Sequence, residues 1–129
     1  MLIDTSGWLC LIHKDEPQHL AATEKFDSAH SHCTTNYILA EFVPLANVRG
    51  LPRKQSLEVL KQIHLDPSIE ITWVDKALHV EALELLTKRG DKTYSLCDAV
   101  SFLVMRKLGL TDALTTDGHF KQEGFVRLL

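Results

Sequence analysis

The 129-residue sequence lacks the features of a membrane or secreted protein. No apolar run approaches the roughly 20 residues that a membrane-spanning helix needs. The opening residues, MLIDTSGWLCLIH, have no basic segment before the apolar ones, and Asp4 interrupts these early. We therefore expect neither a secretory signal nor a membrane association.

Cysteine is scarce, and its pattern argues against a disulfide framework. The three residues Cys10, Cys33 and Cys97 are an odd number without paired spacing. Reduced thiols and a cytoplasmic protein are therefore expected. Internal repeats, low-complexity tracts and linkers are absent as well. A chain of this length fits one core, so we predict a single domain over 1–129.

An excess of positive charge is also missing. The chain carries 14 Lys and Arg against 17 Asp and Glu, a net charge of −3. Domains that bind nucleic acid are usually basic, so this balance argues against a nucleic-acid-binding surface over the whole chain. It still allows a basic rim around an acidic site. Two basic clusters are candidates for that rim or are solvated helix ends: Arg49, Arg53 and Lys54, and Lys88, Arg89 and Lys92.

Short apolar runs alternate with segments of helical spacing along the chain. Strands are predicted at 2–4, 32–35, 69–74 and 113–116, with 125–129 as a candidate fifth. Helices are predicted at 6–13, 17–29, 36–50, 53–65, 75–90 and 95–109, with a short turn at 117–122. This alternation predicts a three-layer α/β/α fold with a four- to five-stranded parallel sheet. Asn36 is expected to cap its helix, and Pro44 to kink or weaken it.

Four acidic residues fall at one edge of the predicted sheet. Asp4 ends the first strand, and Asp117 follows the fourth. Asp98 lies in the first turn of its helix, and Glu41 lies one turn into the helix after the second strand. In an open parallel sheet, the ends of the strands and the starts of the following helices share one edge, where ligands bind. The four carboxylates are therefore expected to meet there.

Converging carboxylates repel each other unless a cation neutralises them. Oxygen ligands without a nearby Cys or His set favour Mg²⁺ or Mn²⁺ over Zn²⁺. Paired ions about 4 Å apart support in-line phosphodiester chemistry. The pattern thus predicts metal-dependent phosphodiester hydrolysis. Small hydroxyl groups near the acids are available to position water or phosphate, namely those of Thr5, Ser6, Thr115 and Thr116.

Each acid taken alone also has a structural explanation. Asp4 and Asp117 suit turns or caps, and Glu41 suits a solvated helix face. Asp98 follows Ser95 by three residues, which is the spacing of a capping box. The coincidence of all four on one edge is what favours a site.

Four segments resemble the PIN-domain family, especially its VapC-type toxin branch. They are LIDTSGWL at 2–9, TTNYILAEFV at 34–43, DKTYSLCDAVSFLVM at 91–105 and ALTTDGHFKQEGFVRLL at 113–129. They occur in the family's order and span nearly the whole chain. Ser-Leu-x-Asp-Ala and Leu-Thr-Thr-Asp-x-x-Phe are the more specific parts.

The resemblance implies a metal-dependent endoribonuclease, the toxin of a type II toxin–antitoxin pair. Its catalytic quartet corresponds to Asp4, Glu41, Asp98 and Asp117. Asp4 and Asp98 match the positions that hold the ion, Asp117 completes the metal shell, and Glu41 acts through water. Thr116 and Ser6 match hydroxyl positions that line the pocket. A cognate antitoxin that inserts a segment near the site, and a homodimer, are further implications.

His119 departs from the family pattern, because many relatives have a further acid at this place before the Phe. It is interpreted as an exposed turn histidine, with a phosphate contact as the alternative. The missing fifth carboxylate leaves the number of bound ions open.

Two other functions are alternatives to the nuclease. A non-catalytic RNA-binding or protein-interaction module on the same fold has little reason to gather four repelling carboxylates. A receiver-like phospho-acceptor domain needs a central-strand aspartate acceptor and a lysine after a late strand, and neither stands out here.

Overall fold

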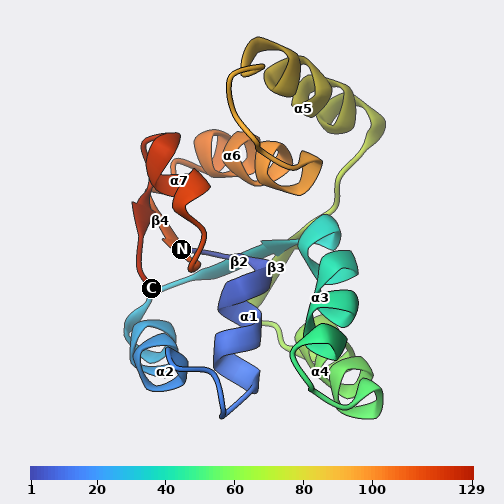
Figure 1. Cartoon of the computed structure of the whole chain (residues 1–129), viewed down its shortest axis with the longest axis vertical. Coiled ribbons are helices and arrows are strands. Elements are labelled where there is room, and N and C mark those ends of the chain that lie inside the picture. The colour runs from blue at the N-terminus through green and yellow to red at the C-terminus, as the bar shows by residue number, and fades with distance from the viewer.

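Five short parallel strands form the centre of the molecule (Figure 1). The computed structural model describes all residues from Met1 to Leu129. The strands are β1 (Leu2–Ile3), β2 (His32–Thr35), β3 (Ile69–Thr72), β4 (Asp112–Leu114) and β5 (Val126–Arg127). The helices are α1 (Thr5–Ile12), α2 (His19–Ser28), α3 (Asn36–Val48), α4 (Arg53–Leu65), α5 (Lys76–Lys88), α6 (Leu96–Leu108) and α7 (Gly118–Gln122). None of the helices combines the length and hydrophobicity that crossing a bilayer requires.

The strand order is β3-β2-β1-β4-β5, so the first strand lies in the middle of the sheet. Leu2 is in register with Cys33 on one side and with Ala113 on the other. The chain builds outward from β1 in one direction and later returns to its other side. This reversal of strand order opens a crevice beyond the carboxyl ends of β1 and β4.

Helices cover both faces of the sheet (Figure 1). On one side lies α6, in which every residue from Cys97 to Met105 is buried, with α5 packed on its outer side. A helix buried all round belongs to the core. On the other side lie α1 and α2. The predicted α/β/α fold is confirmed, with five strands in its sheet.

Gly7 allows α1 to lie directly against β4. A Cβ atom at this position would be 2.0 Å from the carbonyl oxygen of Leu114, well inside van der Waals contact. That same oxygen accepts a hydrogen bond of 3.2 Å from the amide of Asp4. The absence of a side chain at Gly7 therefore brings the start of α1 next to the end of β4.

Two local expectations are wrong. β1 ends at Ile3, so Asp4 occupies the N-cap position of α1 and not the last position of the strand. Thr35, and not Asn36, caps α3, through a hydrogen bond of 3.2 Å from the amide of Ile38 to its side chain. The side-chain oxygen of Asn36 instead accepts from the amide of Val74, where the chain leaves β3.

Pro44 does not end α3, which continues through it to Val48. Proline lacks the amide that would bond to the carbonyl four residues earlier, that of Ala40. Both residues are exposed, so water can satisfy this carbonyl group. The helix therefore continues past Pro44 with the exposed carbonyl group of Ala40 open to water, and the weakening of α3 by Pro44 stays a prediction.

Candidate metal and active site

A cleft of about 700 Å³ opens beyond the carboxyl ends of β1 and β4. Its lining includes seven of the residues predicted for the site: Asp4, Thr5, Ser6, Glu41, Asp98, Thr116 and Asp117. Pro44, Leu45 and Val48 of α3 form an apolar wall. Side chains from distant parts of the chain thus share one solvent-accessible hollow.

Asp4 is buried in the cleft and, like Asp98, only 7% exposed. Its Oδ2 accepts hydrogen bonds from the hydroxyl groups of Thr115 at 2.9 Å and Ser6 at 3.3 Å. Burial raises the pKa of Asp4 to about 6, although hydrogen bonds from the Thr5 backbone and the Thr115 side chain lower it, and the charges of Asp98 and Asp117 add to the rise. A cation in the cleft would relieve this cost.

Ser6 and Thr115 connect Asp4 to the loop that follows β4. Their hydroxyl oxygens are 3.0 Å apart, and Ser6 Oγ accepts from the amide of Thr116. Thr115 Oγ1 accepts from the amide of Asp117 at 3.0 Å. Thr116 lines the cleft, but the hydroxyl group that binds the acid belongs to its fully buried neighbour, Thr115.

Asp98 serves both as a cap and as a member of the site. Its Oδ2 accepts from the amide of Ser95 at 2.8 Å, and its own amide donates to Ser95 Oγ at 3.0 Å. This is the capping box that the sequence predicted. Oδ1 makes no hydrogen bond within the protein, so the cap leaves this oxygen available.

Asp117 and His119 lie beside Asp98 at the start of α7. Asp117 Oδ1 accepts from the amide of His119 at 2.8 Å. The Nδ1 atom of His119 is 3.0 Å from Asp98 Oδ2 and 3.4 Å from Asp117 Oδ2. Ligand atoms of these three residues all lie within 4.8 Å of one another, which makes them a candidate metal-binding cluster. Asp4 and Glu41 line the same cleft outside this cluster.

The interpretation of His119 as an exposed turn histidine is therefore wrong. Its side chain is only 24% exposed and takes part in the cluster. The spacing Asp117-x-His119 at the start of a short helix was the available signal, because an N-cap residue and the second helical residue lie close together. Sequence alone did not show that Asp98 would approach the same ring.

Glu41 projects from α3, and it is the exposed acid of the quartet. Its Oε2 accepts a hydrogen bond of 3.1 Å from the hydroxyl group of Thr5. The thiol of Cys97 lies nearby, and burial, with the charges of Glu41 and Asp4, raises its pKa far above the ordinary value. Cys97 therefore stays protonated and is not a nucleophile.

Two of the predicted basic residues are neutralised within the fold. Arg49 forms a bidentate pair with Glu16, at 3.0 and 2.7 Å, and Arg89 forms one with Glu123, at 3.2 and 3.0 Å. Arg127 instead donates to the backbone oxygen of Thr116 at 3.3 Å, at the rim of the cleft. Arg127 is thus the basic side chain that the structure ties to the site.

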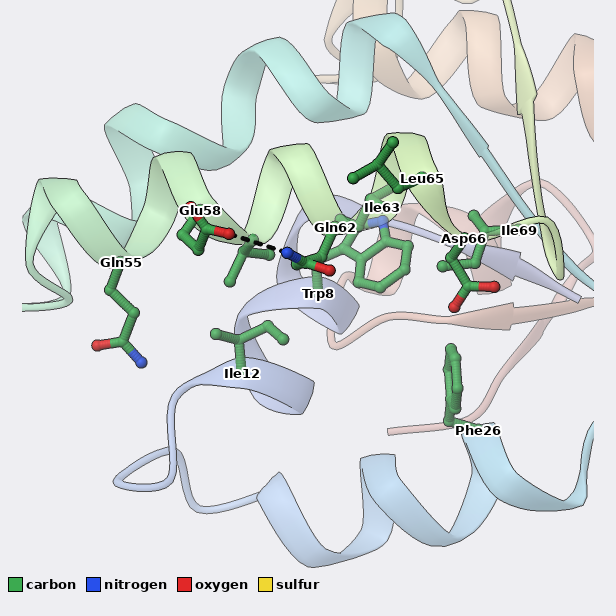
Figure 2. A pocket seen from close by; sticks show the side chains of 11 residues that line it. Trp8, Ile12, Phe26, Gln55, Glu58, Gln62, Ile63, Leu65, Asp66 and Ile69 are labelled. Atoms are coloured by element: carbon green, nitrogen blue, oxygen red, sulfur yellow. Dashed lines mark hydrogen bonds between the residues drawn. The ribbon is translucent and has the colours of Figure 1, made fainter.

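A second hollow, of about 550 Å³, lies between α1, α2 and α4 (Figure 2). Trp8 and Ile12 reach it from α1, Phe26 from α2 and Ile63 from α4. Its lining is mainly apolar and contains no cluster of metal-binding groups. Trp8 is buried, and its indole N–H donates to Thr34, so this side chain belongs to the core.

The model of the PIN domain matches residues 1–125, so the chain belongs to the PIN-domain family. It is similar to the 23S rRNA-specific endonuclease VapC20 of Mycobacterium tuberculosis, in strains CDC 1551 / Oshkosh and ATCC 25618 / H37Rv. Each is 32% identical over 129 residues, 99% of this chain and 97% of the relative.

The same relationship holds in three dimensions. The crystal structure of Mycobacterium tuberculosis VapC20, a sarcin-ricin loop cleaving toxin, matches with a TM-score of 0.88 and 31% identity. The match covers 97% of this chain and 95% of that chain. The predicted family and its VapC-type branch are confirmed.

Proposed function

We propose that this protein is a divalent-metal-dependent endoribonuclease and the toxin of a type II toxin–antitoxin pair, formed by one domain over 1–129. The observation that carries the proposal is the convergence of Asp4, Glu41, Asp98 and Asp117 in one cleft of a PIN-domain fold. Similarity to an endonuclease that is specific for 23S rRNA supports ribosomal RNA as the substrate class. Such a substrate implies action in the cytoplasm.

The residues present suit a divalent cation. Asp98 and Asp117 belong to the metal-binding cluster, and Asp4 is a buried acid whose raised pKa a cation would lower. We assign these three carboxylates to Mg²⁺ or Mn²⁺, which oxygen ligands favour. When bound, the ion lowers the pKa of a coordinated water and neutralises charge on the phosphate.

The remaining residues hold and orient the reacting groups. Glu41 is free to accept a proton from the attacking water, because its Oε2 is fixed by the Thr5 hydroxyl while the side chain is exposed. Ser6 and Thr115 fix the Asp4 carboxylate. Thr116, exposed at the rim, is placed to bind a phosphate oxygen through its hydroxyl group.

The groove between α1, α2 and α4 supports the proposal that a partner protein binds there (Figure 2). An apolar groove between helices suits the apolar face of an amphipathic helix. Leu65 lies at the groove and is 75% exposed, so a partner would cover it. We assign this surface to the cognate antitoxin as a second contact, because it shares no lining residue with the cleft near which the resemblance places the antitoxin segment.

Exposed apolar side chains on α5 support the expected homodimer. Val80 and Leu83 are three residues apart and share one helix face, at 44% and 45% exposure. Light scattering of the purified chain and of the double variant Val80→Asp/Leu83→Asp measures its oligomeric state. A monomeric wild-type protein would contradict the assignment.

The decisive experiment is cleavage of an oligonucleotide with the sequence of the sarcin-ricin loop and of a shuffled control RNA. Cleavage is expected with MgCl₂ or MnCl₂ and is expected to stop in EDTA. Asp98→Asn should lower the rate by at least about a hundredfold. Circular dichroism checks that the fold of the variant survives.

Full cleavage in EDTA would overturn the proposal. RNA binding that is independent of metal, without any product, would favour the binding module instead. The exposed Glu84→Gln on α5 is a matched control, because it changes one carboxylate away from the cleft.

A further inference from the structure

The imidazole of His119 lies where a ligand of the proposed ion would lie. Its Nδ1 atom is 3.0 Å from Asp98 Oδ2 and 3.4 Å from Asp117 Oδ2. Neighbouring ligands of an octahedral ion with bonds of 2.0–2.1 Å are themselves about 3 Å apart. His119 Nδ1 is therefore about as far from each carboxylate as two ligands of one cation are from each other, and ligand atoms of all three residues lie within 4.8 Å of one another.

The second ring nitrogen of His119 has a hydrogen-bonding partner that is compatible with metal binding through Nδ1. Nε2 is 3.1 Å from the hydroxyl oxygen of Thr93, which can accept a hydrogen bond from Nε2–H. With an ion bound, this tautomer would direct the Nδ1 lone pair to the ion, whereas without an ion Nδ1–H can donate to Asp98 and the Thr93 hydroxyl can donate to Nε2. Histidines that bind metals usually donate their other N–H to an oxygen in this way.

The plane of the ring is held from two further directions. Tyr94 packs edge-on against it, with centroids 5.1 Å apart and planes at 65°. The hydroxyl of Tyr94 donates to Glu123 at 3.1 Å, which fixes the aromatic ring. The amide of His119 is bound by Asp117 Oδ1. The imidazole is thus positioned before any ion arrives.

We propose that His119 supplies an imidazole nitrogen to the divalent ion alongside Asp98 and Asp117, and that this ligand biases the site toward Mn²⁺ over Mg²⁺. The inference rests on the proposed function, because it refines the same metal site. Carboxylate and water ligands suit Mg²⁺ and Mn²⁺ alike, whereas an imidazole ligand suits transition metals. Replacing one oxygen ligand by nitrogen therefore penalises Mg²⁺ more than Mn²⁺.

The test is electron spin-echo spectroscopy of the full chain loaded with MnCl₂, combined with calorimetric titration of MnCl₂ and MgCl₂. Wild-type protein should show modulation from a directly bound ¹⁴N nucleus. His119→Asp should keep Mn²⁺ binding, lose the modulation and lower the ratio of Mn²⁺ to Mg²⁺ affinity by about tenfold. His119→Gln, which adds no charge to the cluster, should also lose the modulation.

His64→Asn is the matched control, because His64 is exposed on α4 and its Nδ1 contacts the backbone oxygen of Leu60. It should leave the modulation and both affinities unchanged. Bound Mn²⁺ without nitrogen modulation, or an unchanged affinity ratio in His119→Asp, would overturn the inference. The nuclease proposal would survive that result, whereas metal-independent cleavage by wild-type protein would overturn the nuclease proposal itself.

Discussion

Asp4 is buried at the start of α1, with two hydroxyl groups on one of its oxygens and two further carboxylates nearby. The ionised carboxylate of Asp4 can bind a cation, but when no cation is present this buried charge lowers the free energy of unfolding. The folded pKa of about 6 lies above the unfolded value of 3.8. The folded protein therefore binds the proton more tightly, and its free energy of unfolding falls as the pH rises through this window.

Asp4→Asn should accordingly make the metal-free protein more stable above pH 6, by up to about 3 kcal/mol, while abolishing cleavage. Urea unfolding in EDTA at pH 5 and pH 8 measures this difference. The wild-type protein should lose stability between these pH values, and the variant should lose less. Equal pH dependence in both would contradict the raised pKa.

Glu123 shows the opposite behaviour, although its side chain is only 4% exposed. Burial by itself raises the pKa of Glu123, but hydrogen bonds from Arg89, Arg106 and Tyr94 outweigh this effect and hold it below the usual value. Its stabilising contribution is thus present above the unfolded pKa of 4.5 and is lost as the pH falls below it.

Glu123→Gln should lower the free energy of unfolding at pH 7 by about 1–2 kcal/mol, because the two arginines are partly exposed and water replaces some of the lost interaction. The variant should also flatten the loss of stability below pH 4.5. Thermal unfolding between pH 3 and pH 7 tests both effects. A loss of stability below pH 4.5 equal to that of the wild-type protein would contradict this prediction.

At the scale of the elements, the packing of α1 against β4 depends on Gly7. Gly7→Ala places a methyl group 2.0 Å from the carbonyl oxygen of Leu114. This backbone atom cannot move aside as the end of a flexible side chain could. We expect a loss of at least about 3 kcal/mol, together with loss of metal binding, because Asp4 is at the start of the same helix. Chemical denaturation and Mn²⁺ titration measure the two effects.

Gly118→Ala is the control for this prediction. A Cβ atom at Gly118 would meet nothing within 4 Å, although the residue also lies at the start of a helix beside the cleft. It should leave stability within about 0.5 kcal/mol of the wild-type protein. Similar losses in both variants would show that tight packing at Gly7 is not the cause.

The elements that the sequence predicted well are those with local signals. The capping box of Ser95 and Asp98 needs only one turn of helix, and Asp75, the first residue of the helix predicted at 75–90, caps α5 through the amide of Leu78. The cap of α3 was misplaced because Thr35 and Asn36 both have capping side chains. The choice between them depends on Val74, which is brought to Asn36 only by the pairing of β2 and β3.

In the candidate site, too, the features that depend on the fold class were predicted, and the contacts between distant residues were not. The shared edge of a parallel sheet was enough to bring Asp4, Asp98 and Asp117 into one cleft. The placement of His119 depends on Thr93 and Asp98, two residues from outside its own helix. Local patterns carry no information about such contacts, and this is why the histidine was misassigned.

For the whole molecule, the proposed metal site predicts that cations and protons compete for the carboxylate of Asp4. MnCl₂ at about 100 times its dissociation constant should stabilise the fold by about 2.7 kcal/mol at pH 7.5. The gain should shrink at pH 5, because Asp4, with a pKa of about 6, is then largely protonated. Differential scanning calorimetry measures both conditions.

Asp98→Asn should remove most of this gain, and NaCl at equal ionic strength should not reproduce it. A gain that is equal at both pH values would contradict the involvement of Asp4. A gain that survives in Asp98→Asn would place the cation elsewhere in the molecule.

The central position of β1 has a consequence for protein synthesis. β1 is the first strand to be made, but its partner β4 is added only after most of the chain, and Asp98 and Asp117 come equally late. A growing chain therefore holds an incomplete cleft for most of its translation. If its substrate is ribosomal RNA, as proposed, the ribosome that makes this enzyme is protected from it until the last acid has emerged.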